Sequence, residues 1–247
     1  MPKFFVNNEQ VNEERIKIIG EDVNHIANVL RKQIGDTLNI CNTSTSDNFL
    51  CQIERINKEE IECKIVEKKK SETEPNTYIT IFQGLPKAEK MDLIIQKCTE
   101  IGVSNFVPVS MERCIVKFDN KTENKKIERW QKIAETAAKQ SGRDIIPKVE
   151  NLINLKKVCN LIEKYDILLL AYENEKENTL KIALNSLKNK ENAKIGIIIG
   201  PEGGITTEEV QILVNSGAVK ITLGNRILRT ETVGISMASI ILYELEK

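Results

Sequence analysis

The sequence predicts an α/β protein in which a small β-rich domain precedes a larger domain with a mostly parallel sheet. Short β segments dominate up to about residue 70. Continuous apolar runs follow at Asp166–Ala171 and Lys194–Gly200, as expected for strands buried on both faces. These strands alternate with helical patterns, which indicates a parallel sheet. The polar stretch Lys68–Asn76 has no apolar anchor and is the best linker candidate. We therefore expect a first domain at residues 1–70, a linker at 71–77 and a second domain at 78–247.

The first region contains one helix among its candidate strands. Glu21–Arg31 is predicted to be helical because Val23, Ile26, Ala27 and Leu30 share one face. Turn signals rich in Gly, Asn and Asp separate the strands. The predicted strands are Arg15–Ile19, Thr37–Cys41, Phe49–Ile56 and Ile61–Glu67.

The second region alternates between β-branched runs and helical patterns. The predicted strands are Tyr78–Leu85, Asn105–Val109, Asp166–Ala171, Lys194–Gly200 and Val219–Leu223. The predicted helices are Lys87–Ile101, Ile127–Gln140, Thr207–Ser216 and Thr232–Leu245. The last of these helices is apolar almost all round, so we expect it to be buried in its own domain or in a second subunit.

Composition narrows the function classes. The 247 residues include 36 basic and 36 acidic side chains, so bulk charge alone would not hold nucleic acid. The middle of the chain is mildly positive, which permits such a partner without implying one. Neither a transmembrane segment nor a signal peptide is predicted, and the six cysteines form no CxxC pair, which indicates a reduced, cytoplasmic protein. His25 is the only histidine, so no metal site is expected.

The stretch IGIIIGPEGGITTEEV, residues 195–210, joins a buried strand to a helix through a glycine-rich turn. Ligands of open α/β sheets bind beyond the carboxyl ends of the strands. No Walker Lys-Ser/Thr pair is present. Thr206 and Glu209 fit a capping box, and Glu208 adds negative charge to the first helical turn. A neutral or cationic ligand therefore fits better than a phosphate, although a tight turn without any ligand is an equally good interpretation of this stretch alone.

The stretch LGNRILRTETVGISM, residues 223–237, places Arg226 and Arg229 in a loop at the end of another strand. Arginine is suited to phosphates and planar bases. The competing interpretation is that both arginines pair with carboxylates such as Glu202 or Glu231. Taken alone, the stretch HIANVLR, residues 25–31, predicts a surface helix with a solvated His25.

Together these stretches resemble one family, the bacterial 16S ribosomal RNA uridine N3-methyltransferases of the SPOUT superfamily. The resemblance covers nearly the whole chain and rests on GLPKAEKMDLIIQKCTEIGV, ERCIVK, RWQKIAETAAKQSGR, IGPEGG and LGNRILRTET, with HIANVLRKQIGD similar to the family's first domain. It implies an N-terminal PUA-like β-barrel and a C-terminal SPOUT domain with a deep trefoil knot. It also implies S-adenosylmethionine as the cofactor, a homodimer, and 16S rRNA within the assembled small ribosomal subunit as the substrate.

The resemblance also implies roles for particular residues. The cofactor carries a sulfonium cation and no phosphate, which agrees with the helix start at Thr206. Arg229 would stabilise the anion that forms on the uracil, and Glu231 would either accept the N3 proton or hold Arg229. Expected RNA contacts are Arg31, Lys32, Arg113 and Arg226, with Lys87, Lys90 and Lys117 as further candidates. Expected cofactor contacts are Leu170, Ala171, Gly200, Pro201, Glu202, Gly203, Gly204, Leu223, Gly224, Ile227, Leu228 and Thr230.

Three other functions remain open from the sequence, of which a nucleotide-binding α/β enzyme ranks last because the Walker and Rossmann patterns are absent. Another SPOUT methyltransferase would modify a ribose 2′-hydroxyl or a different base. A non-catalytic assembly factor would use a PUA-like module to bind RNA and would not bind the cofactor.

Overall fold

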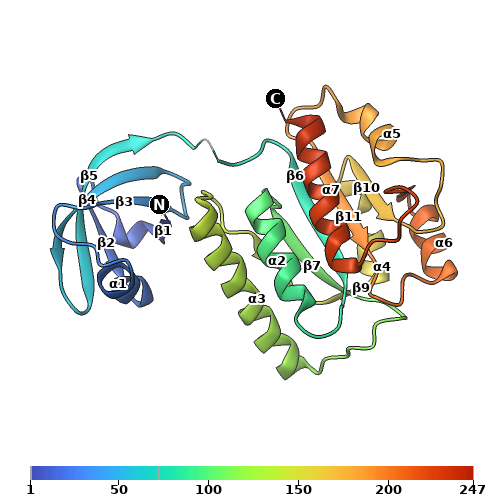
Figure 1. The fold of residues 1–247 in the computed structure, drawn as a ribbon, viewed down its shortest axis with the longest axis horizontal. Helices are drawn as coiled ribbons and strands as arrows, with labels where there is room; N and C mark the ends of the chain where they lie inside the picture. Colours follow the sequence, from blue (N-terminus) through green and yellow to red (C-terminus); the bar gives the residue numbers. More distant parts are fainter. Residues whose placement is uncertain (1, 72, 247) are drawn as a thin grey trace. The chain divides into compact units, whose positions relative to one another are not determined.

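The computed structural model describes residues 2–71 and 73–246 (Figure 1). Contacts divide the chain into two units, one formed by Met1–Glu74 with Ala138–Ile146 and the other by Pro75–Ala137 with Pro147–Lys247. Residues 1 and 247, which end the predicted domains, and residue 72 of the predicted linker lie outside the described residues. The predicted limits at residues 70 and 78 stay a prediction.

The first unit is a curled five-stranded sheet in the order β1-β3-β4-β5-β2, parallel between β1 and β3 and otherwise antiparallel. Its side chains alternate between solvent and core, so that Ile16 and Ile18 of β2 are buried with Phe4 and Ile40. The β-rich first region is therefore confirmed. The elements are β1 (Lys3–Val6), η1 (Asn8–Gln10), β2 (Arg15–Ile19), α1 (Glu21–Asn24), η2 (His25–Val29), β3 (Thr37–Asn42), β4 (Asn48–Ile56) and β5 (Glu60–Lys69).

The predicted single helix at Glu21–Arg31 is wrong in its second half. After α1 the chain forms a π-helical turn, η2, because Leu30 N donates to His25 O, 2.9 Å away. Apolar spacing does not distinguish an α-helix from such a turn. His25 is not solvated as expected: it is half-buried edge-on against Phe4, with the ring centroids 6.0 Å apart.

A buried carboxylate, Asp144, and a half-buried one, Glu74, attach Ala138–Ile146 to the rest of the first unit. Asp144 is 2% exposed and accepts hydrogen bonds from Lys3 and Ser71. Glu74 accepts from the Arg143 guanidinium at 2.6 Å and from Asp144 N at 2.7 Å. Burial lowers the pKa of Lys3. Buried charges with these partners are tolerated because each has an opposite charge or a donor at hydrogen-bond distance.

The second unit has a seven-stranded parallel sheet in the order β12-β10-β11-β6-β7-β8, with β9 also paired to β7. The predicted parallel α/β domain is thus confirmed. Its strands are β6 (Tyr78–Gly84), β7 (Asn105–Ser110), β8 (Lys148–Val149), β9 (Ile153–Asn154), β10 (Ile167–Ala171), β11 (Lys194–Ile199) and β12 (Val219–Ile221). Its helices are α2 (Lys90–Ile101), α3 (Asn120–Ser141, whose last residues belong to the first unit), α4 (Leu155–Cys159), η3 (Ile162–Lys164), α5 (Leu180–Leu184), η4 (Asn185–Leu187), α6 (Thr207–Asn215) and α7 (Thr230–Leu245).

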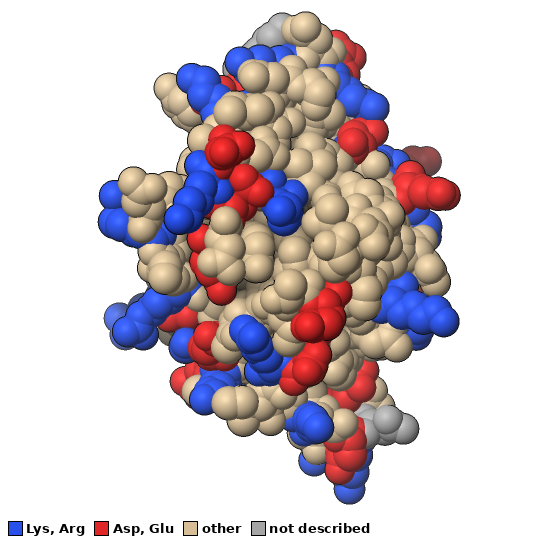
Figure 2. All heavy atoms as spheres, turned by 90° about the vertical axis from the view of Figure 1, so that its right-hand side faces the viewer, with Lys and Arg blue, Asp and Glu red and all other residues tan. Residues whose placement is uncertain are grey.

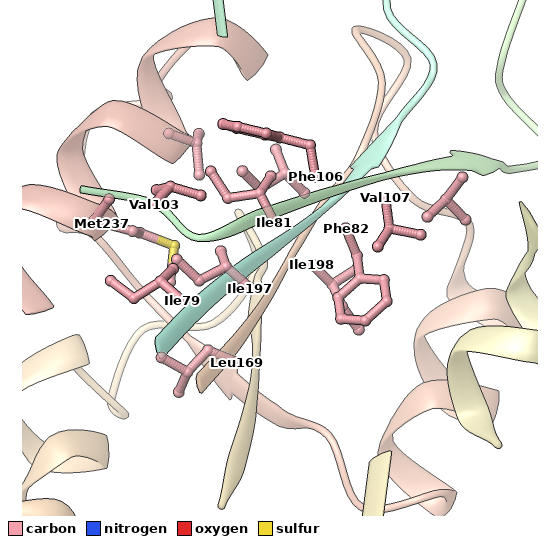
Figure 3. Packing of buried hydrophobic residues seen from close by; sticks show 14 of the residues in the cluster. Ile79, Ile81, Phe82, Val103, Phe106, Val107, Leu169, Ile197, Ile198 and Met237 are labelled. Carbon is pink, nitrogen blue, oxygen red and sulfur yellow. The ribbon is translucent and has the colours of Figure 1, made fainter. Parts of the chain in front are cut away.

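The central strands are buried on both faces. Figure 3 shows Ile79 and Ile81 of β6 on the side of Met237 from α7, and Phe82 with Val107 and Ile198 on the opposite side. The labelled residues are all buried, in agreement with the continuous apolar runs of the sequence.

Several element limits differ from the sequence-based expectations. The helix predicted from Lys87 begins at Lys90, after Ala88 adopts a φ of 53°. The helix predicted from Ile127 begins at Asn120, and the last helix begins at Thr230 instead of Thr232. The strands β1, β8 and β9 were not predicted, and the last two have only two residues each. No helix among residues 2–71 and 73–246 is both long and apolar enough to span a membrane.

Candidate active site

The strand order brings the loops that follow β10, β11 and β12 to one edge of the parallel sheet. β10 lies between β12 and β11, and β11 pairs with β6, so the carboxyl ends of all four strands meet at this edge. Two neighbouring hollows lie there, with volumes of about 370 and 430 Å³. Both volumes are in the range of roughly 300–1,000 Å³ that is common for small-molecule sites. We call the first, which is lined by Leu223–Leu228, the β12 hollow. The second, which is lined by Ile199–Ile205, is the β11 hollow. They share Ala171, Glu173, Ile227, Leu228 and Val233.

Nearly all the residues predicted to bind a cofactor come together here. The exception is Leu170, which is fully buried in the core and lines neither hollow. The predicted residues that line the hollows are Ala171, Gly200, Pro201, Glu202, Gly203, Gly204, Leu223, Gly224, Ile227, Leu228 and Thr230.

The glycine-rich loop Gly200–Gly204 packs closely against its neighbours at the glycine positions. A Cβ on Gly200 would lie 2.7 Å from the Ile205 side chain. Gly204 has a φ of 72°, which glycine adopts most easily, and a Cβ there would lie 3.2 Å from Glu173 Oε1. The Glu173 carboxylate therefore lies directly beside this loop.

The first turn of α6 has no room for an anion, as predicted. The capping box between Thr206 and Glu209 is formed: Thr206 Oγ1 accepts from Glu209 N at 3.2 Å, and Glu209 Oε2 accepts from Thr206 N at 3.2 Å. Glu209 Oε1 also accepts from Glu112 N at 2.8 Å. These bonds occupy the backbone donors of Thr206 and Glu209 and place a negative charge at the start of the helix, where a phosphate would otherwise bind.

Lys90 lies between the two carboxylates that the sequence offered as partners for the arginines. Lys90 Nζ is 3.0 Å from Glu202 Oε1 and 3.3 Å from Glu231 Oε2, although the latter atom makes no hydrogen bond of good geometry. A hydrogen bond with Glu202 raises the pKa of Lys90. Burial acts to raise the pKa of Glu202, but hydrogen bonds from backbone N–H groups, including that of Lys87, and from Lys90 outweigh it and lower that pKa.

The pairing of the arginines with Glu202 or Glu231 is therefore wrong. Among the described residues, Arg226 and Arg229 form no ion pair, and both are exposed. Arg226 lines the β12 hollow and Arg229 the β11 hollow. Glu231 lines neither hollow but has Lys90 as its ionic partner, so it does not hold Arg229.

The other predicted RNA contacts fall in two places. Arg31 and Lys32 follow η2 in the first unit, where Arg31 is exposed and has a φ of 52°. Arg113 lies in the second unit and donates from Nη1 to Gly203 O at 2.9 Å, so it supports the glycine-rich loop. Their contact with RNA stays a prediction.

Sequence reasoning missed several residues of the site. Glu173, Glu175 and Lys176 follow the strand β10 and line the β12 hollow. Their signal was available, because they come directly after a strand whose carboxyl end was already expected to face a ligand. Gln83 gave no signal, because it is one polar residue inside an apolar strand. Within the described part of the chain, no group of three or more His, Cys, Asp or Glu side chains is placed to hold a metal ion.

The comparisons with known proteins agree with this fold and site. Residues 73–242 match the RNA methyltransferase domain family, and residues 18–66 match the RNA methyltransferase PUA domain family. The fold and the site therefore define an RNA methyltransferase with a PUA domain. The chain is 34% identical to ribosomal RNA small subunit methyltransferase E of Bacillus subtilis (strain 168), over 100% of this chain and 98% of that protein. It is 32% identical to the Mesomycoplasma hyopneumoniae (strain 232) protein of the same name, over 95% and 96% of the two chains. The chain belongs to the ribosomal RNA small subunit methyltransferase E family, which confirms the resemblance.

Solved structures support the same conclusion. The Neisseria gonorrhoeae ribosomal RNA small subunit methyltransferase E bound to S-adenosyl methionine has a TM-score of 0.86 and 27% identity, over 98% of this chain and 97% of that one. The putative methyltransferase Lpg2936 of Legionella pneumophila, solved with the cofactor SAM, has a TM-score of 0.85 and 27% identity, over 98% and 96% of the two chains.

Proposed function

We propose that this protein transfers a methyl group from S-adenosylmethionine to N3 of one uridine in the 16S rRNA of the small ribosomal subunit. The observation that carries the proposal is the meeting of the loops Gly200–Gly204 and Leu223–Thr230 around adjoining hollows, with the unpaired Arg229 lining one of them. Family membership and the SAM-bound relatives support the cofactor.

The residues of the hollows suit S-adenosylmethionine. Apolar side chains that could pack on an adenine face, Ile227 and Leu228, line both hollows, and Ile227 is 85% exposed without a ligand. The Glu173 carboxylate lines both hollows as well and offers a negative charge to a sulfonium cation. The occupied start of α6 disfavours a phosphate-bearing nucleotide. When bound, the cofactor would supply an electrophilic methyl group.

Arg229 is proposed as the catalytic cation. N3 of uridine is a poor nucleophile until its proton leaves, and the negative charge then spreads onto O2 and O4. A guanidinium beside one of these oxygens stabilises that charge. Arg229 is placed for this task because it lines the β11 hollow and, among residues 2–71 and 73–246, has no carboxylate partner.

Glu231 is proposed as the acceptor of the N3 proton. It follows Arg229 by two residues, in the first turn of α7. The ammonium of Lys90 lies 3.3 Å from the carboxylate of Glu231. Because Lys90 forms ion pairs with two carboxylates, it is a weaker candidate for an RNA phosphate contact than its sequence position indicated.

The target base must leave its stack before N3 can be reached, so flanking RNA needs its own binding surface. We propose that Arg31 and Lys32 of the PUA unit, with Arg113 and Arg226, contact that RNA. Both signs of charge are interspersed on the face of the molecule shown in Figure 2, and the net charge is zero. Weak binding to naked RNA and a preference for the assembled subunit follow from this balance. We further propose that the protein acts in the cytoplasm.

We propose in addition that the protein forms a homodimer and that its second unit contains a trefoil knot. Tyr243 and Ile240 of α7 are 85% and 40% exposed, and such apolar side chains on the last helix are suited to pack against a second copy. Small residues, Ser236 and Ser239, would allow close approach there.

The test is to incubate the purified protein and S-adenosylmethionine with small subunits from a strain that lacks this enzyme. Mass spectrometry of the nucleosides should detect 3-methyluridine, and primer extension should stop at one position at every nucleotide concentration. A stop that appears only at low nucleotide concentration would indicate a ribose 2′-O-methyl group. Absence of S-adenosylmethionine binding in calorimetry would favour an assembly factor without catalysis.

A further inference from the structure

Gln83 is a fully buried amide at the carboxyl end of β6, beside the proposed cofactor site. Its exposed fraction is 0%, and its neighbours in the strand are apolar or glycine. Burying an amide is costly unless it is hydrogen-bonded. Its Oε1 atom has no hydrogen-bond partner among the described residues, so all its hydrogen bonding rests on Nε2.

The Nε2 group binds both loops of the site. It donates to Thr230 Oγ1 at 2.9 Å and to Gly200 O at 3.4 Å, besides Gly84 O at 2.9 Å. Thr230 Oγ1 in turn donates to Gly200 O at 2.7 Å. Gly200 begins the glycine-rich loop and Thr230 ends the Leu223–Thr230 loop, so one side chain joins the two.

Gly84, the next residue, lets the glycine-rich loop lie directly on the end of β6. A Cβ on Gly84 would be 2.7 Å from Pro201 Cδ and 2.8 Å from Pro201 N. The backbone of the loop is therefore seated against β6 at the place where Gln83 binds it. This close packing fixes the position of the loop Gly200–Gly204, and the hydrogen bond between Gln83 and Thr230 aligns the loop Leu223–Thr230 with it.

We propose that Gln83 is a positioning residue for methyl transfer, which sets the relative position of the loops Gly200–Gly204 and Leu223–Thr230. The inference rests on the proposed function for the identity of the ligand. Thr230 lies between Arg229 and Glu231, so a shift of Thr230 displaces both residues that are assigned to the chemistry. A misplacement of about 1 Å can reduce the rate of an enzyme about 100-fold.

The test compares Gln83→Leu, Thr230→Val and the double variant with wild type. Leucine keeps most of the volume of Gln83 and removes its donor, whereas Thr230→Ser keeps the hydroxyl group. Thr80→Val is the matched control, because Thr80 is a fully buried polar residue of the same strand whose hydroxyl oxygen has no hydrogen-bond partner among the described residues. Amide hydrogen exchange of the free protein reports on the loops without any ligand. Calorimetry with S-adenosylmethionine and steady-state kinetics on unmodified small subunits report on function.

We expect the amides of residues 200–204 and 227–231 to exchange faster in Gln83→Leu and in Thr230→Val, but not in Thr80→Val. The Kd for S-adenosylmethionine should rise about 10-fold in each variant, the effect of losing roughly one buried hydrogen bond. The double variant should lose no more than the larger single loss, and Thr230→Ser should bind within about 2-fold of wild type.

Unchanged exchange in Gln83→Leu, or equal loosening in Thr80→Val, would overturn the positioning role. Losses that multiply in the double variant would also contradict it, because independent groups add their free energies. If wild type bound no S-adenosylmethionine while Gln83→Leu still loosened both loops, the proposed function would fail, whereas the alignment of the two loops by Gln83 would stand.

Discussion

At the scale of single residues, Arg229 and Arg226 differ in their surroundings although they lie three residues apart in one loop. Arg229 lines the β11 hollow with Gly200–Gly204, and Arg226 lines the β12 hollow. Neither forms an ion pair within the described residues. The sequence alone left a salt-bridge role for both arginines open, because it could not show that Lys90 occupies the nearby carboxylates.

Arg229→Ala is expected to lower kcat about 100-fold or more, with an unchanged Kd for S-adenosylmethionine. Loss of one preorganised group that stabilises transition-state charge typically costs this much. Arg226→Ala should instead raise the KM for the small subunit and leave kcat nearly unchanged, because we assign it to an RNA phosphate. Single-turnover methylation and calorimetry measure these values. Full turnover in Arg229→Ala with normal cofactor affinity would exclude the assigned role.

Lys90→Ala is expected to reduce kcat about 10-fold. Without the ammonium, Glu202 and Glu231 lose the cation that lies between them, and Glu202 loses one of the hydrogen bonds that lower its pKa. The acidic limb of the kcat–pH profile should therefore move to higher pH. Lys97→Ala, on the same helix, removes an exposed pair with Glu100 and should leave the profile in place. A Lys90→Ala profile that overlays that of wild type would show that activity does not depend on the pairing of Lys90 with these carboxylates.

At the scale of elements, the carboxylate of Glu246 joins the end of α7 to the start of β6 by hydrogen bonds. Glu246 Oε1 accepts from Thr77 N at 2.8 Å, and Oε2 accepts from Asn76 N at 3.1 Å. Burial acts to raise the pKa of Glu246, but these hydrogen bonds outweigh it and lower the pKa. The bonds join the last helix of the sheet domain to the segment that enters its central strand.

Glu246→Gln should therefore destabilise the protein by about 1 kcal/mol at neutral pH, since an amide accepts more weakly than a carboxylate. The folded-state pKa is depressed, so this stabilisation is present above the unfolded pKa of about 4.3 and is lost as the pH falls through the lower folded value. Thermal unfolding followed by circular dichroism should show a difference from wild type at pH 7 that shrinks below about pH 4. Glu244→Gln is the control on the same helix, and a difference that stays constant with pH would contradict the assignment.

At the scale of the whole molecule, the sequence predicted the sheet domain and its strand-end loops, and nearly all the residues that it assigned to the cofactor line the hollows. These follow from apolar runs and glycine turns, which are local signals. The attachment of Ala138–Ile146 to the first unit was not predictable, because Asp144 and Glu74 meet partners far away in the sequence. The same holds for Gln83 and Lys90, whose roles depend on loops more than 100 residues away.

The two units have separate hydrophobic cores, so we expect them to unfold as separate cooperative units. The reactivity of buried thiols can report the separate unfolding of the two units. Burial raises the pKa of Cys41 to about 11 and those of Cys51, Cys63 and Cys98 to about 12, so little reactive thiolate exists in the native state at pH 8. In pulsed alkylation at increasing urea, read by mass spectrometry, Cys41, Cys51 and Cys63 should become labelled together. Cys98 should follow at higher urea, because its unit has the larger core. A single midpoint for all four thiols would show that the chain unfolds as one cooperative unit.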